Sequence, residues 1–265
     1  MFPSFISLGQ IIYKADVKTR HEMILGGVHH TERSYCEAVF TRVRDSFLKK
    51  VNRFSVTAQT LDTQAGDGIL VFRYKNFLKI ALIEAKLVHP GGFDYIQNGT
   101  SQSHFTTQII KQGSWSNNFA CFELFILKLP IGQDSPPLDR DGSSCAWRST
   151  ALQHIQGRPR TPVLWKMSDL IGTNHLRLCN LEDIVNDILS CSEGRGLNYL
   201  PADGFIEVLD NAGARTMKVP IPDLFWGTRT RNRVDNFLKE FGFGFYEYFN
   251  FSSIESEADI VKGDS

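Results

Sequence analysis

The sequence predicts an α/β fold, in which helices and strands alternate along the chain and pack in layers. Three observations support this class. A segment with apolar residues at helical spacing follows residue 32. Three strand-like segments rich in β-branched and aromatic residues lie between residues 53 and 87. A short amphipathic segment and a long apolar run then extend to residue 129. The predicted order is helix, strand, strand, strand, helix, strand.

The bounds of these predicted elements can be assigned from residues in the first half of the chain. We expect a helix at 32–51, strands at about 53–60, 69–74 and 80–87, a helix at 103–112 and a strand at 119–129. Ser34 and Glu37 have the spacing of a capping box at the start of the first helix. Lys75-Asn76 joins the second and third strands. Pro90 ends the third strand because proline cannot donate a ladder hydrogen bond, and Gly113 ends the second helix.

The sequence pattern of the second half of the chain predicts fewer helices and strands. Residues 130–162 are rich in Pro, Gly, Ser and Asp and are expected to form a long connection. We then expect a helix over 180–191, a hairpin of strands at 205–209 and 215–219, a helix at 230–241 and an aromatic core strand after residue 243. Whether residues 130–265 extend the same sheet or form a separate subdomain is left open by the sequence.

The amino-acid composition limits the classes of protein to which this chain can belong. The chain has 265 residues, of which 42% are hydrophobic, enough for a sizeable core. Its 29 basic residues equal its 29 acidic residues, so no overall field attracts nucleic acid. No apolar run approaches the roughly 18 residues that span a bilayer. The five cysteines are an odd number without metal-binding spacing. We therefore expect a soluble, cytoplasmic protein with reduced thiols and no membrane association.

Three charged residues lie where the second and third strands should meet. Asp67 precedes one strand, and Glu84 and Lys86 lie at the end of the other. Residues i and i+2 of a strand share a face, so Glu84 and Lys86 should point the same way. An antiparallel hairpin would bring Asp67 beside them. A second acid-x-Lys triplet, Asp16-Val17-Lys18, has no comparable strand before it.

Asp67, Glu84-Ala85-Lys86 and the order of elements over residues 30–129 resemble the PD-(D/E)xK nuclease superfamily, the fold of many type II restriction endonucleases. Gly66 stands where the family name has proline. The resemblance implies a restriction-endonuclease-like core, with a central mixed β-sheet flanked by helices, over residues 1–129. Residues 130–265 would then be a C-terminal extension for target recognition or dimerisation, packed on the same domain.

The resemblance also implies site chemistry. Asp67, Glu84 and the backbone carbonyl of Ala85 would bind Mg²⁺, with Mn²⁺ as a substitute, and hard oxygen ligands suit such ions. Lys86 would orient or deprotonate the attacking water, and an unpaired Lys86 would have a lowered pKa. Glu37 could be a first-helix ligand, although its capping role competes. Gln108 and Lys111 lie where relatives place a polar residue that orients the DNA substrate. Independently of the resemblance, three arginines at alternate positions have the spacing to contact guanine edges or phosphates, with a solvated helix start as the alternative: Arg229, Arg231 and Arg233.

The leading hypothesis is a Mg²⁺-dependent endonuclease of a restriction or defence system that cuts double-stranded DNA as a homodimer. A second hypothesis keeps the fold without catalysis, as a module that binds nucleic acid or protein. A third is a hydrolase that uses Cys36 or Cys145 with a histidine, but no sequence feature brings such a pair together.

Overall fold

The structure is a computed structural model that describes residues 8–47, 51–57, 66–89, 92–96, 103–128, 138–158, 164–171, 176–199, 204–222 and 228–254. Its helices are α1 Leu8–Leu25, α2 Glu32–Ser46, α3 His104–Gln112, α4 Arg148–Gln156, α5 Met167–Ile171, α6 Leu181–Ser190 and α7 Thr228–Phe241, with a 3₁₀ turn at Gly113–Trp115. Its strands are β1 Asn52–Thr57, β2 Gly68–Tyr74, β3 Phe77–Val88, β4 Ala120–Leu127, β5 Ser144–Trp147, β6 Cys179–Asn180, β7 Leu197–Asn198, β8 Phe205–Leu209, β9 Thr216–Pro220 and β10 Phe245–Asn250.

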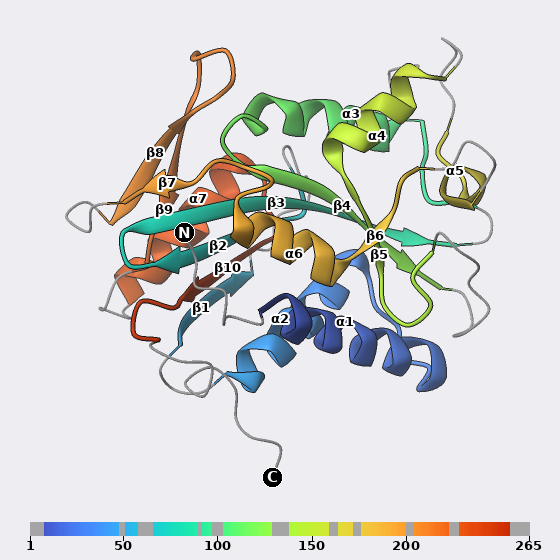
Figure 1. Ribbon diagram of the computed structural model, residues 1–265, viewed down its shortest axis with the longest axis horizontal. Coiled ribbons are helices and arrows are strands. Elements are labelled where there is room, and N and C mark those ends of the chain that lie inside the picture. The colour runs from blue at the N-terminus through green and yellow to red at the C-terminus, as the bar shows by residue number, and fades with distance from the viewer. Residues whose placement is uncertain are drawn as a thin grey trace.

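A central mixed sheet organises the molecule, as Figure 1 shows. Its strand order is β1-β10-β2-β3-β4-β5-β6, and β7 pairs with β3. Helices α1, α2 and α6 cover one face, against side chains such as Ile83 and Phe122. Helices α3, α4 and α7 and the β8–β9 hairpin cover the other face, against side chains such as Leu82 and Phe125. The predicted α/β class is correct at this level.

The predicted hairpin of the second and third strands is present. β2 and β3 pair antiparallel from Tyr74 and Phe77 at the turn to Gly68 and Ile83 at the far end. Lys75 and Asn76 form the turn, and Lys75 has a left-handed φ of 55°. β4 lies parallel to β3 on its other side, and the connection between them contains α3. The far end of the hairpin is therefore the edge where the predicted site residues lie.

The last described strand is inserted into the sheet next to the edge strand β1. β10 runs antiparallel to β1 and parallel to β2 and separates them. β5 and β6 also continue the sheet beyond β4. Residues after 129 thus extend the same sheet, one of the two alternatives left open by the sequence. Their role in target recognition or dimerisation stays a prediction.

Helix α1 was not predicted. Its buried positions include Asp16, Thr19 and Arg20, which interrupt the apolar periodicity that marks a helix in sequence. The buried Asp16 accepts hydrogen bonds from the Tyr35 hydroxyl at 2.8 Å and the Ser143 N–H at 2.6 Å. Such partners compensate for a buried carboxylate. The triplet Asp16-Val17-Lys18 lies within α1, and so it is helical rather than part of a strand end.

Two predicted boundaries were wrong. Thr31, not Ser34, is the N-cap of α2, and Ser34 is its partner in the capping box. The helix ends at Ser46 rather than residue 51, and residues 48–50 lie outside the described part. The predicted connection at 130–162 contains β5 and α4, whose four-residue strand and weakly apolar helix lack a clear periodic signal.

Predictions for the C-terminal half agree more closely. Helix α6, the β8–β9 hairpin and helix α7 lie within two residues of their predicted bounds. The strand predicted after residue 243 is β10. Asn180 caps α6 by accepting a hydrogen bond from the Asp183 N–H. Among the described helices, none combines the length and apolar character needed to cross a membrane.

Candidate active site

Asp67 is fixed at the head of β2 by three sets of hydrogen bonds. Its N–H donates to the Ile83 carbonyl at 2.7 Å. Its carbonyl accepts from the N–H groups of Gly244 and Phe245, at 2.8 and 3.2 Å. Its side-chain Oδ2 accepts from the Ala85 N–H at 2.7 Å. Ile83 and Ala85 flank Glu84, so the hairpin brings the two acids together as its pattern predicts.

Gly66 gives a physical reason for the missing proline. Its φ is +141°, far from the φ near −65° to which a proline ring is restricted. A Cβ at this position would lie 2.8 Å from the Ile83 carbonyl oxygen. Glycine alone suits both the dihedral angle and the close approach. The chain thus reaches Asp67 by a path that excludes proline.

Glu84 and Lys86 form a buried ion pair on the α3 side of the sheet. Lys86 Nζ lies 2.5 Å from Glu84 Oε1, and the residues are 6% and 0% exposed. The Lys86 ammonium group also lies 5.5 Å from the ring centroid of Phe105 in α3. Ile83 and Ala85 point to the opposite face. The predicted alternation is present, but Lys86 is paired rather than unpaired.

Burial and mutual charge shift the pKa values of Asp67, Glu84 and Lys86. It raises the pKa of Asp67 to about 6, against the opposing effect of Lys86. Burial and the nearby Asp67 raise the pKa of Glu84 to about 8. Burial alone lowers the pKa of Lys86, but the negative charges of Glu84 and Asp67 outweigh it and raise that pKa. The lowered pKa was expected for an unpaired Lys86, and the ion pair with Glu84 means that this condition is not met.

The first-helix glutamate beside the site is Glu32, not Glu37. Glu32 Oε1 accepts a hydrogen bond from the Leu87 N–H at 3.0 Å. Its charge also acts on the ionisation of Asp67, Glu84 and Lys86. Glu37 instead influences Glu247 on another strand.

Sequence reasoning missed Glu123 on β4. In the parallel ladder it lies directly beside Glu84. It is fully buried, and neither carboxyl oxygen has a hydrogen-bond partner among the described residues. Burial and then the neighbouring Glu84 raise its pKa well above the ordinary value. The available signal was one acid within the otherwise apolar run Phe119–Leu127.

Helix α3 presents amides to the site region. Gln108 and Gln112 are buried, whereas Lys111 is exposed. Gln112 Nε2 lies 3.7 Å from the position of a Cβ on Gly66, beside Asp67. Neither polar side-chain atom of Gln112 has a described hydrogen-bond partner. The helix thus directs one predicted residue and one unpredicted residue inward.

The predicted arginine cluster lies elsewhere. Arg229, Arg231 and Arg233 are exposed on the first turns of α7. This helix packs on β9, β1 and β10. No hydrogen bond or ion pair between these arginines and Asp67, Glu84 or Lys86 occurs among the described contacts. Their predicted role in DNA binding stays a prediction.

The thiol hypothesis finds little support. Cys36 and Cys145 are fully buried, and burial raises both pKa values well above normal. A nucleophilic cysteine requires the opposite shift and an accessible sulfur atom. Both residues pack in the apolar core. We interpret them as core residues.

The donor set fits a hard divalent cation held by few protein ligands. Glu84 Oε2 is buried without a described hydrogen-bond partner, as are both oxygens of Glu123. No group of three or more His, Cys, Asp and Glu side chains in the described ranges is arranged to hold a metal ion. Mg²⁺ commonly uses one or two protein carboxylates and completes its shell with water and substrate phosphate. Asp67 and Glu84, with the Ala85 carbonyl, meet that smaller requirement.

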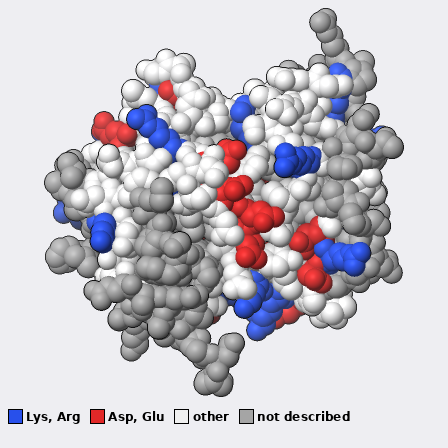
Figure 2. Space-filling model, in the orientation of Figure 1, with Lys and Arg blue, Asp and Glu red and all other residues white. Residues whose placement is uncertain are grey.

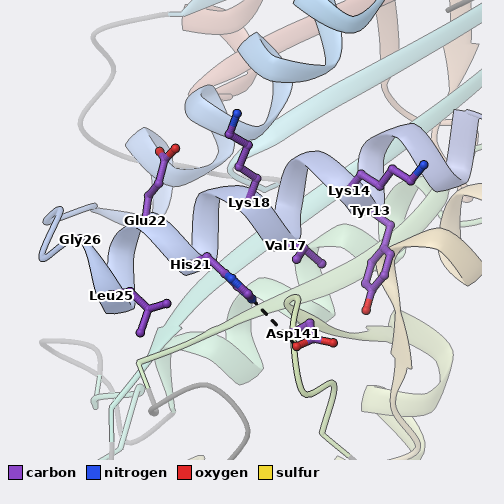
Figure 3. A pocket seen from close by; sticks show the side chains of 9 residues that line it. All are labelled: Tyr13, Lys14, Val17, Lys18, His21, Glu22, Leu25, Gly26 and Asp141. Atoms are coloured by element: carbon purple, nitrogen blue, oxygen red, sulfur yellow. Dashed lines mark ion pairs between the residues drawn. The ribbon is translucent and has the colours of Figure 1, made fainter. Parts of the chain in front are cut away.

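Two other surface features lie apart from these acids. A groove of about 810 Å³ runs along the outer side of α1, lined by Tyr13, Val17, His21 and Leu25 among others (Figure 3). Acidic side chains gather over α6, which carries Glu182 and Asp183 in its first turn (Figure 2). A negatively charged surface repels a phosphate backbone.

No protein-family model, curated protein sequence or solved structure matches this chain. A functional conclusion therefore depends on the geometry of its own residues.

Proposed function

We propose that this protein is a Mg²⁺-dependent DNA endonuclease of the restriction or defence type. The observation that carries the proposal is the arrangement of Asp67 against the Ala85 N–H, with the Glu84–Lys86 pair on the same strand end. Two acids and a lysine at one edge of a mixed sheet suit metal-assisted phosphodiester hydrolysis. The similarity to the PD-(D/E)xK superfamily agrees with this placement.

The residues at this end of the hairpin have different roles in the proposed reaction. Asp67, Glu84 and the Ala85 carbonyl hold Mg²⁺ or Mn²⁺. When bound, the ion supplies an acidified water and offsets phosphate charge. Lys86 keeps its positive charge, orients the water and stabilises the charge that develops on the phosphate. Glu32 positions the end of β3 through the Leu87 N–H.

Substrate, assembly and location belong to the same proposal. Double-stranded DNA is the substrate, and a two-fold homodimer supplies one site for each strand. The protein acts in the cytoplasm. Of Asp67, Glu84 and Lys86, Asp67 is the one that is partly exposed as a whole residue, so we expect the phosphate to approach from its side of the hairpin.

Incubation of the full chain with supercoiled plasmid tests the proposal. We expect cleavage with Mg²⁺ or Mn²⁺ and none with EDTA. Asp67→Ala, Glu84→Ala and Lys86→Ala should each lower the rate by about 100-fold or more. Glu207→Gln, an exposed position on β8, is the control and should cut normally. Full cleavage by the Lys86 variant, or by the wild type in EDTA, would overturn it.

One observation favours the second candidate, a nuclease fold that binds without catalysis. Glu84 is fully buried and Lys86 nearly so, a degree of burial that limits access for a phosphate. Under this candidate, plasmid is bound but never nicked, and chelator has no effect. The plasmid assay, paired with a gel-shift measurement on the same samples, separates the two functions.

A further inference from the structure

Glu84 and Glu123 lie side by side in the interior of the sheet. They are partners in the parallel β3–β4 ladder, where neighbouring strands are about 5 Å apart. Ala85 and Leu124, the next residues along each strand, point toward α1, α2 and α6. Side chains alternate between faces, so both glutamates point toward α3. Two carboxyl groups are thus buried side by side in the layer between the sheet and α3.

Three oxygen atoms in this layer lack hydrogen-bond partners among the described residues. They are Glu84 Oε2 and both carboxyl oxygens of Glu123. Both residues are 0% exposed, so solvent does not compensate for them. The Lys86 ammonium group contacts the other oxygen of Glu84. A buried carboxylate is costly unless a proton, a hydrogen-bond donor or a cation compensates its charge.

Another buried glutamate of the same sheet offers a comparison. Glu247 on β10 is 2% exposed, and its carboxylate accepts hydrogen bonds from Arg44 and Ser55 at 2.6–2.8 Å. This fold therefore supplies donors to an interior glutamate where the position is purely structural. Glu123 receives none from the described chain. A bound cation would supply the partner that the described residues do not.

A second buried polar group lies near the residue that precedes Asp67. Gln112 is 0% exposed, and both of its polar side-chain atoms lack described partners. Its amide nitrogen lies close to Gly66, which precedes Asp67. The Gln side-chain amide has both donors and an acceptor, so it can form hydrogen bonds with water molecules bound to an ion, whereas an apolar side chain cannot.

We propose that Glu123 is a further ligand of the divalent cation that Glu84 binds, and that the two carboxylates hold Mg²⁺ or Mn²⁺ on the side of β3 and β4 that faces α3. The inference rests on the proposed function for the role of Glu84. Two carboxylates, with water completing the shell, form a site typical of Mg²⁺.

Titration of Mn²⁺ into the metal-free full chain tests the proposal, with calorimetry for affinity and thermal unfolding as a second readout. The wild type should bind Mn²⁺ and gain thermal stability. Glu123→Gln should weaken binding roughly tenfold or more and lose the Mn²⁺-dependent stabilisation. Glu247→Gln is the matched control on the same sheet and should bind as the wild type does. Glu123→Met replaces Glu123→Gln should the latter fail to fold.

Unchanged Mn²⁺ affinity in the Glu123 variant, or no binding by the wild type, overturns the inference. A variant that alters only the pH dependence of unfolding would show that Glu84 and Glu123 share protons instead, and also overturns it. Chelator-sensitive plasmid cleavage with unchanged Mn²⁺ affinity in Glu123→Gln leaves the nuclease proposal standing and removes Glu123 from the site. Weakened affinity without any cleavage by the wild type supports the ligand assignment and removes the nuclease.

Discussion

The carboxylate of Asp67 takes the place of a backbone acceptor for Ala85, at 2.7 Å from the Ala85 nitrogen. The Asp67 carbonyl is already occupied by the N–H groups of Gly244 and Phe245 at the start of β10. The side chain therefore completes the end of the β2–β3 ladder. Asp67, which we propose to be catalytic, thus also stabilises the end of the hairpin, and its contribution to stability can be measured separately from activity.

This contact predicts different effects for two substitutions of Asp67. Asp67→Asn retains an oxygen acceptor for the Ala85 N–H, whereas Asp67→Ala leaves that donor without a partner. We expect the alanine variant to be less stable than the asparagine variant by about 1–2 kcal/mol. Urea unfolding measures the difference. Equal stabilities would show that the hydrogen bond contributes little, and loss of cleavage in both variants would fit the proposed function.

Gly66→Ala should be destabilising for two reasons that one control separates. The substitution places a Cβ 2.8 Å from the Ile83 carbonyl and strains a φ of +141°. Gly213 has a φ of +67° but no atom within 4 Å of its Cβ position. We expect Gly213→Ala to cost about 1 kcal/mol and Gly66→Ala about 1–3 kcal/mol more. Equal losses in urea unfolding would contradict the close approach.

Glu32 and Glu37 lie on the same helix and make a matched pair. Glu32 accepts from the Leu87 N–H, next to Lys86, and Glu37 does not contact this strand end in the described structure. Under the proposed function, Glu32→Gln should slow plasmid cleavage by about tenfold. Glu37→Gln should cut at the wild-type rate. A slower Glu37 variant beside a normal Glu32 variant would restore the original assignment.

The raised pKa values predict a pH dependence of stability in the absence of divalent ions. The folded-state pKa values of Asp67 and Glu84, about 6 and 8, exceed the values near 4 of the unfolded chain. The folded protein therefore binds more protons between about pH 4 and 8, and its stability falls as pH rises through that window. Each kcal/mol lost lowers Tm by about 2–4 °C in a domain near this size.

Thermal unfolding in EDTA at pH 5, 6, 7 and 8 measures this fall. Glu84→Gln removes the group with the higher pKa, so its Tm should change less between pH 6 and 8. Saturating Mn²⁺ should also flatten the wild-type curve, because a cation at the carboxylates replaces the proton. A Tm that rises from pH 5 to 8 in EDTA would contradict the assigned directions.

Local sequence signals accounted for much of the fold. The β2–β3 hairpin, α6 and α7 have strong periodicity and clear turn or cap residues, so their places followed from the chain alone. The missed helix α1 buries Asp16, Thr19 and Arg20, and the partners that make this possible lie as far away as Ser143. Periodicity cannot register such long-range compensation. Glu32 was missed for a similar reason, because its partner Leu87 lies 55 residues away.

The sequence by itself determined that Asp67, Glu84 and Lys86 share one end of a hairpin, because strand alternation and a two-residue turn are local properties. Only the tertiary structure decided what surrounds them. The insertion of β10 between β1 and β2 fixes the Asp67 carbonyl, and the parallel pairing of β4 places Glu123 beside Glu84. Both depend on contacts between distant segments. Burial then sets the ionisation of the group, since desolvation arises only when the layers of the fold close over it.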